Sequence, residues 1–227
     1  MRSKQFKLDS DINVKIVKNS RSRQIKLTIT TDNIARISIP GWMPYMAGLQ
    51  FANTKKEWIR DHLHPNQLYK DGQLIGKNHR IVFKTTSNNS ISSKITLLEI
   101  IVYIPENINY ASREVQSEIL NSCYKAFKQE AQILLTQRVD QLASKYNFQY
   151  QSLKFRKLKS RWGSCDSHQN ITLSLKLMEL PWNLIDYVIV HELIHTKIMN
   201  HQNQFWHEFS NIVPNPKKLK NELKQYR

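Results

Sequence analysis

Apolar and polar residues alternate along much of the first hundred positions, which is the pattern of half-buried β-strands. Ile25, Leu27 and Ile29 alternate with polar neighbours, and residues 34–39 repeat the pattern after an Asp-Asn turn. We therefore predict a β-meander over residues 5–39. The elements expected next are a helix over residues 44–63 and further strands between residues 69 and 104.

The second half of the chain has mainly helical spacing, and it begins with a long helix over residues 111–146 that has at most one break. Pro181 is well placed to open another helix, because the first turn needs no N–H from it. The remaining predicted elements are strands at 149–155 and 171–175 and helices at 182–199, 203–211 and 217–225.

These patterns together predict an α+β protein. A mostly β N-terminal part, residues 1–108, precedes a helical part with a small sheet, residues 109–227.

The predicted helix over residues 182–199 contains the motif HExxH, formed by His191, Glu192 and His195. Residues four apart lie on one face of a helix, so the two imidazoles can bind one metal ion. Glu192 can reach the same ion from the side and accept a proton from its bound water. The flanking residues are apolar on several sides, which indicates a buried helix whose polar groups need partners.

A third ligand is expected after a turn, and His201 stands ten residues after His191. That spacing matches the motif HExxHxxGxxH, although Ile198 replaces its glycine and no methionine follows to form a Met-turn. Asn200 can adopt the left-handed conformation that ends a helix. The competing third ligands are His207 and Glu208.

Other residues near the motif have two interpretations each. Asp186 could orient a ligand or lie exposed near the helix start, and Cys165 could be a fourth ligand of a structural site. Gly163 could let backbone approach the substrate or simply form a turn while Trp162 packs against the helix. The candidates for contact with the substrate or its oxyanion are Arg161, Tyr187, Asn200 and Lys197.

The charge is unusual, with 34 Lys and Arg against 18 Asp and Glu and a net charge of +16. This excess favours a polyanionic partner such as nucleic acid, although a solvated basic surface has the same composition. A run of cations before the HExxH helix is either a phosphate-binding surface or a solvated strand face. Its members are Lys154, Arg156, Lys157, Lys159 and Arg161.

The two cysteines form no disulfide framework, and no window is apolar enough to cross a membrane. The polar N-terminus has no secretion signal, so a cytoplasmic protein is expected. The sequence leaves the oligomeric state unknown.

Several segments together resemble the YgjP-like metallopeptidase family, a relative of the SprT-like and WLM zinc proteases. The resemblance rests on the segment SRWGSC at residues 160–165, the motif HELxH, Met199-Asn200-His201, and Phe205-Trp206. It implies a zincin-like metallopeptidase fold for residues 109–227. It also implies one zinc ion held by His191, His195 and His201, with Glu192 as catalytic acid and base. It also implies a polypeptide substrate.

The main hypothesis is therefore a zinc-dependent peptidase that acts through a metal-bound water activated by Glu192, in a setting that could include nucleic acid. One alternative is a zinc-dependent nucleotide phosphohydrolase of the pyrophosphatase type, which the same water and the basic strand would suit. Another is a nucleic-acid-binding module whose zinc is structural.

Overall fold

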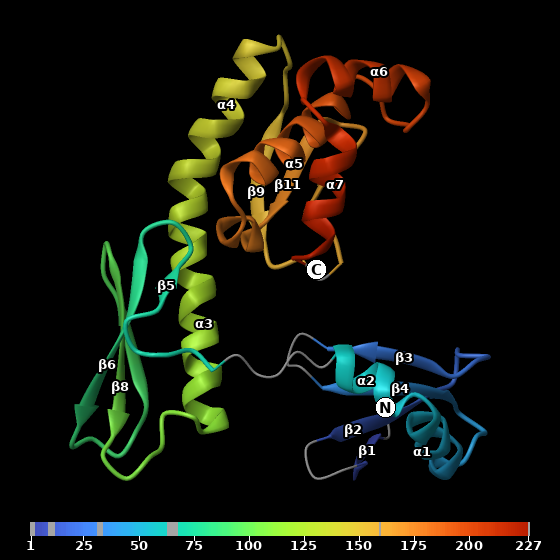
Figure 1. Cartoon of the computed structure of the whole chain (residues 1–227), viewed down its shortest axis with the longest axis vertical. Coiled ribbons are helices and arrows are strands. Elements are labelled where there is room, and N and C mark those ends of the chain that lie inside the picture. Colours follow the sequence, from blue (N-terminus) through green and yellow to red (C-terminus); the bar gives the residue numbers. More distant parts are fainter. Residues whose placement is uncertain (1–2, 9–11, 31–33, 63–67, 159, 227) are drawn as a thin grey trace. The chain divides into compact units, whose positions relative to one another are not determined.

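The computed structural model describes residues 3–8, 12–30, 34–62, 68–158 and 160–226 (Figure 1). Contacts between Cα atoms divide the chain into two compact units, Met1–Leu68 and Tyr69–Arg227. Each unit has its own hydrophobic core. Helices and small sheets occur in both, so the predicted α+β class is confirmed.

The first unit is a four-stranded sheet with two helices. Val14 and Ile16 on one central strand, and Ile37 and Ile39 on the other, are fully buried, because alternate residues of both strands face helix α1. The elements are β1 (Ser3–Lys7), β2 (Asn13–Asn19), β3 (Lys26–Ile29), β4 (Ala35–Pro40), α1 (Tyr45–Thr54) and α2 (Lys56–His62).

The order of the strands differs from the predicted meander. The sheet runs β1-β2-β4-β3, with β2 parallel to β4 and Ile16 opposite Ile37. Alternation predicts which segments are strands but not which strands pair, so the meander prediction was wrong. The hairpin β3–β4 is antiparallel as expected, and its Asp32-Asn33 turn lies outside the described residues. The single helix expected over residues 44–63 is two helices that divide at Lys55.

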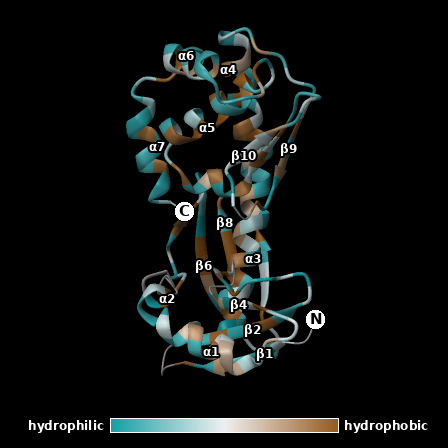
Figure 2. Ribbon diagram, turned by 90° about the vertical axis from the view of Figure 1, so that its right-hand side faces the viewer, coloured by the Kyte–Doolittle hydropathy of each residue, from teal (hydrophilic) through white to brown (hydrophobic). Residues whose placement is uncertain are grey.

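The second unit begins with a four-stranded sheet that packs against a long helix (Figure 2). The strand order is β5-β6-β8-β7, and β6 and β8 form a parallel apolar centre. Its elements are β5 (Leu74–Ile75), β6 (His79–Thr86), β7 (Ser92–Ile95), β8 (Glu99–Pro105) and α3 (Arg113–Glu130).

The long helix begins at Ser112, whose hydroxyl accepts a hydrogen bond from the Val115 N–H at 3.3 Å. A single π-helical turn, Ala131–Leu135, separates α3 from α4 (Thr136–Lys145). This π turn is the one break that the spacing allowed. Such turns insert one extra residue and shift the side chains that follow around the helix axis.

The rest of the second unit carries the HExxH motif. A three-stranded sheet of order β10-β11-β9 lies against α5, which also contacts α4, α6 and α7. The elements are β9 (Ser152–Arg156), β10 (Gly163–Cys165), β11 (Asn170–Ser174), a 3₁₀ turn (Leu175–Glu179), α5 (Trp182–Ile194), α6 (Asn203–Ile212) and α7 (Pro216–Lys224).

Helix α5 is buried on nearly all sides because its residues are apolar around the whole circumference. Pro181 stands at its N-cap with φ −62°, as the sequence predicted. The helix ends at Ile194 rather than near residue 199. The expected boundary between residues 108 and 109 falls inside the second unit, between β8 and α3, which pack against each other.

A buried, hydrogen-bonded pair of side chains joins the first sheet of the second unit to the end of α3. The Glu130 carboxylate lies 2.6 Å from His79 Nδ1 and accepts hydrogen bonds from the N–H groups of Lys77 and Asn78. Gly76, with φ +64°, brings its backbone against that carboxylate. A Cβ at this position would lie 2.3 Å from Glu130 Oε2.

We therefore expect Gly76→Ala to lower the free energy of unfolding by about 3 kcal/mol, because it adds backbone strain and a collision with a buried charge. Gly72 is a matched control, since its φ is +76° but no atom lies within 4 Å of the added Cβ. Gly72→Ala should lose only about 1 kcal/mol. Denaturant unfolding of both variants measures the difference, and equal losses would contradict the packing argument.

Candidate metal centre

The two histidines of the HExxH motif come from the end of helix α5. His191 lies in its last turn, and His195 is the residue that caps it. Four residues separate them, so both side chains project from the same side of the helix. The chain then turns through residues 196–200 and brings His201 back beside them, just before helix α6.

The turn is built by short-range hydrogen bonds rather than by a left-handed residue. The N–H groups of Thr196 and Lys197 bond to the carbonyls of Leu193 and Ile194. Asn200 does not have a positive φ, so that expectation was wrong. Its side chain instead accepts a hydrogen bond from the Gln202 N–H at 3.3 Å.

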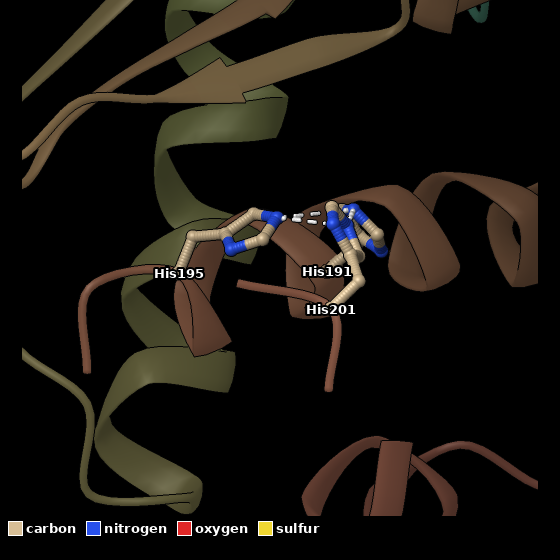
Figure 3. A group of neighbouring side chains, drawn as sticks. All are labelled: His191, His195 and His201. Atoms are coloured by element: carbon tan, nitrogen blue, oxygen red, sulfur yellow. Dashed lines mark hydrogen bonds between the residues drawn. The ribbon is translucent and has the colours of Figure 1, made fainter. Parts of the chain in front are cut away.

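The three imidazoles converge through the same ring atom (Figure 3). The Nε2 atom of His191 lies 3.3 Å from that of His195 and 3.0 Å from that of His201. The remaining pair, His195 and His201, is 3.2 Å apart. Three rings from a helix end and a turn therefore point one nitrogen each at a common centre.

Hydrogen bonding fixes the orientation of His195. Its Nδ1 lies 2.9 Å from the Ile198 carbonyl oxygen, which can only accept, so Nδ1 carries the proton. The lone pair of Nε2 is then free to bind a metal ion. The Nδ1 of His191 is buried and has no hydrogen-bond partner among the described residues.

Burial favours the neutral form of two of the rings, His191 and His201, and metal binding would require that form. It lowers the pKa of His191 to about 3, with a smaller effect from the nearby His195 and His201. The pKa of His201 is also lowered, mainly by burial and then by His195 and Lys220. These imidazoles therefore do not need to lose a proton at neutral pH before they bind an ion.

An aromatic side chain supports all three rings. Phe205 is fully buried, and its ring centroid lies 4.9, 4.8 and 4.7 Å from those of His191, His195 and His201. One apolar ring therefore contacts every member of the group.

These distances fit a transition metal. Tetrahedral coordination at about 2.0–2.1 Å places nitrogen ligands about 3.3 Å apart, close to the separations found here. Three neutral imidazole nitrogens are typical zinc ligands, and they leave a fourth position open. The donor set and the spacing therefore fit a zinc ion.

Glu192 lies beside this group and against strand β10. Its side chain is buried, and burial raises its pKa to about 7, while the positive charge of Arg161 acts in the opposite direction. A Cβ on Gly163 would lie 2.7 Å from Glu192 Oε1 and 2.8 Å from its Cγ. The absence of a side chain at residue 163 therefore makes room for the carboxylate.

Neither interpretation of Gly163 included this contact with Glu192. The residue lies in a strand with negative φ, so it does not form a turn. Trp162 is buried in the same core cluster as α5, as the packing interpretation expected. Sequence reasoning missed both strand β10 and its contact with Glu192. The glycine within RWGSC was the available signal.

The competing ligands lie outside the histidine group. Among the described residues, the group of potential metal ligands consists of His191, His195 and His201. His207 is exposed and pairs with Asn211 at 3.4 Å, and Glu208 is not a member. Cys165 is not a member either, and burial raises the pKa of its thiol to about 11, so it is not poised as a thiolate ligand.

The candidates for substrate contact differ in their surroundings. Tyr187 is buried and packs edge-on against Phe209, with centroids 5.0 Å apart. The ammonium of Lys197 lies over the Phe148 ring at 4.5 Å. Arg161 is exposed, and its charge acts on Glu192. Lys197 and Asn200 are exposed as well, so Arg161 is distinguished by its effect on Glu192 rather than by its accessibility.

Asp186 pairs with helix α4 rather than with a ligand. Its two carboxylate oxygens accept hydrogen bonds from Nε and Nη2 of Arg138 at 2.7 and 2.5 Å. This bidentate pair joins α4 to α5 in a half-buried position. Neither proposed role for Asp186, orienting a ligand or lying free at the helix start, describes this contact.

Comparison with known proteins defines the class. The sequence model of the family described as "YgjP-like, metallopeptidase domain" matches residues 23–226, which is most of the chain. The protein is thus a metallopeptidase domain. More narrowly, the chain belongs to the YgjP-like family, and the resemblance noted in the sequence is confirmed.

Similarity to other proteins is limited. A crystal structure of the metallopeptidase zymogen abylysin from Pyrococcus abyssi shares 20% identity, with a TM-score of 0.38, over 40% of this chain and 93% of that chain. No curated protein matches the chain. Within the described part of the chain, no helix is long and apolar enough to cross a membrane.

Proposed function

We propose that this metallopeptidase uses one zinc ion, held by His191, His195 and His201, to hydrolyse peptide bonds in polypeptides. The observation that supports this most strongly is the convergence of three Nε2 atoms within 3.0–3.3 Å of one another. A zinc ion in such a site supplies Lewis acidity that polarises a carbonyl and lowers the pKa of water.

Residues of the chain supply the proton transfer, the contact with the substrate and the positioning of the site. Glu192 accepts a proton from the attacking water and returns it to the leaving amine, and a pKa near 7 suits both directions of transfer. Arg161 is our candidate for contact with the substrate or its oxyanion. The buried Phe205 holds the three rings in place, and Gly163 leaves room for the Glu192 side chain.

The test is metal analysis of the purified protein together with two hydrolysis assays, one on an unfolded protein and one on nucleoside triphosphates. We expect one zinc ion per chain and proteolysis that a chelator abolishes and added zinc restores. Hydrolysis of nucleotides without proteolysis would instead favour the phosphohydrolase, and zinc without either activity would favour a structural site.

A pair of histidine variants tests the ligand assignment. His201→Ala should leave substoichiometric zinc and no measurable proteolysis, because it removes one of three ligands. His207→Ala is the matched control, since His207 is also exposed and lies only six residues further on. The control should keep full zinc and activity. A similar loss in both variants would show that the assignment of His201 is wrong.

A further inference from the structure

A second candidate binding site lies away from the histidine group, at the opposite edge of the three-stranded sheet. The order β10-β11-β9 places β10, which contacts Glu192, at one edge and β9 at the other. A shallow hollow of about 550 Å³ separates β9 from the long helix. This hollow plays no part in the proposed peptidase chemistry.

The polar lining of the hollow is cationic. Lys154 and Arg156 come from β9, and Lys128 comes from α3. All three are exposed, and none forms an ion pair with an acid among the described residues. None of the described residues that line the hollow is acidic. Three like charges around one concavity repel one another and attract an anion.

The helix contributes uncharged donors to the same hollow. Gln132 and Thr136 follow Lys128 at intervals of four residues, and all three line it. In an α-helix, each step of four residues moves about 40° around the axis. The wider π turn at Ala131–Leu135 reduces this drift, so the three side chains form a row that faces β9.

The lining suits the phosphate oxygens of a flexible, single-stranded nucleic acid. Lysine, arginine, glutamine and threonine side chains are the groups that contact the phosphates of nucleic acids. Phe155 lies between the two cations of β9 in the sequence and packs against the hydrophobic core, so it contributes an apolar part of the lining. Lys154 and Arg156 were two members of the cationic run in the sequence. Lys159, another member, lies outside the described residues.

We propose that this hollow binds the phosphate backbone of single-stranded nucleic acid. The net charge of +16 strengthens attraction to such a polymer over the whole chain, and the hollow supplies the local contacts. The site is independent of the peptidase centre, so its test does not depend on zinc or on proteolysis.

The test measures binding of a labelled oligothymidine strand of about 16 nucleotides to the full chain over a range of salt concentrations. The variant replaces Lys128, Lys154 and Arg156 with glutamine. We expect affinity to fall by about tenfold or more. The slope of log affinity against log salt should become shallower by about 2, because each lost phosphate contact contributes about 0.7.

A control variant distinguishes the effect of local contacts on affinity from the effect of the overall charge. The control replaces three exposed residues on strands of the second unit, Arg80, Lys84 and Lys94. Like the three residues of the hollow, they are two lysines and one arginine. Their replacement by glutamine changes the net charge equally and should change affinity less than twofold. Both variants should keep zinc content and proteolysis, because none of the six residues belongs to the histidine group.

Four outcomes would overturn the proposal. The variant in the hollow could bind the strand as tightly as the wild type, or the control could lose as much affinity. Alternatively, poly-glutamate could displace the strand at equal charge concentration, which would indicate an acidic protein segment as the occupant. A nucleoside triphosphate that binds the hollow more tightly than the strand would likewise exclude a polymer site.

Discussion

Replacing Glu192 with glutamine is expected to lower the rate of peptide hydrolysis by about 10²–10⁴-fold and to leave the zinc content unchanged. Glutamine has nearly the same shape but cannot accept a proton from water. The three imidazoles do not depend on this side chain for their convergence, since the contacts among them involve only ring atoms. Metal analysis and initial rates on the same samples measure both effects.

The variant should also fold at least as well as the wild type. Burial raises the pKa of Glu192 to about 7, which means that the folded protein disfavours the charged carboxylate at neutral pH. A neutral amide removes that cost in the metal-free protein. A thermal unfolding midpoint no lower than that of the wild type would confirm that lost activity does not reflect lost structure.

Glu208 offers a matched control for the charge change. It was a competing ligand in the sequence, but it lies outside the histidine group. Glu208→Gln should therefore keep both zinc and activity. If Glu192→Gln retains more than a tenth of wild-type activity, another group acts as the base and the role of Glu192 is wrong.

The convergence of the histidines could be predicted from sequence because it is mostly local. Four residues along a helix fix the separation of His191 and His195, and a short turn limits where His201 can lie. The turn itself was predicted less well. Its geometry depends on the Ile198 carbonyl meeting His195 Nδ1, a contact that no spacing rule encodes.

Long-range pairings were not predictable in the same way. Alternation identified β3 and β4 as strands but gave no information about the parallel pairing of β4 with β2. The buried pair of His79 and Glu130 joins residues 51 positions apart, and neither residue belongs to a periodic pattern that indicates the other. Strand β10 is only three residues long, too short for alternation to identify it.

Gly163 illustrates how such a pairing affects the site. We expect Gly163→Ala to lower the turnover number by about 100-fold with zinc content unchanged. The reason is that moving a catalytic group such as the Glu192 carboxylate by about 1 Å lowers the rate by roughly that factor. The added Cβ would overlap Oε1, Cγ and Cδ of Glu192, at 2.7, 2.8 and 2.9 Å. Steady-state kinetics with metal analysis measure the effect.

The backbone of β10 cannot easily move away from the new methyl group. Gly163 pairs with Leu173 of β11, and the Trp162 carbonyl accepts a hydrogen bond from the Ser174 N–H at 2.8 Å. The carboxylate of Glu192 must therefore shift instead. Ser164→Ala is the neighbouring control, because alternate residues of a strand face opposite sides, and it should keep wild-type turnover.

A double-mutant cycle separates displacement of the carboxylate from general damage to the strand. Glu192→Asp shortens the side chain and misplaces the same carboxylate, so it should reduce turnover by itself. If Gly163 acts through Glu192, the loss in the double variant should be well below the product of the two single losses, because both changes disrupt one positioned group. Losses that multiply fully would show that residue 163 affects catalysis by another route, through the substrate or the stability of β10.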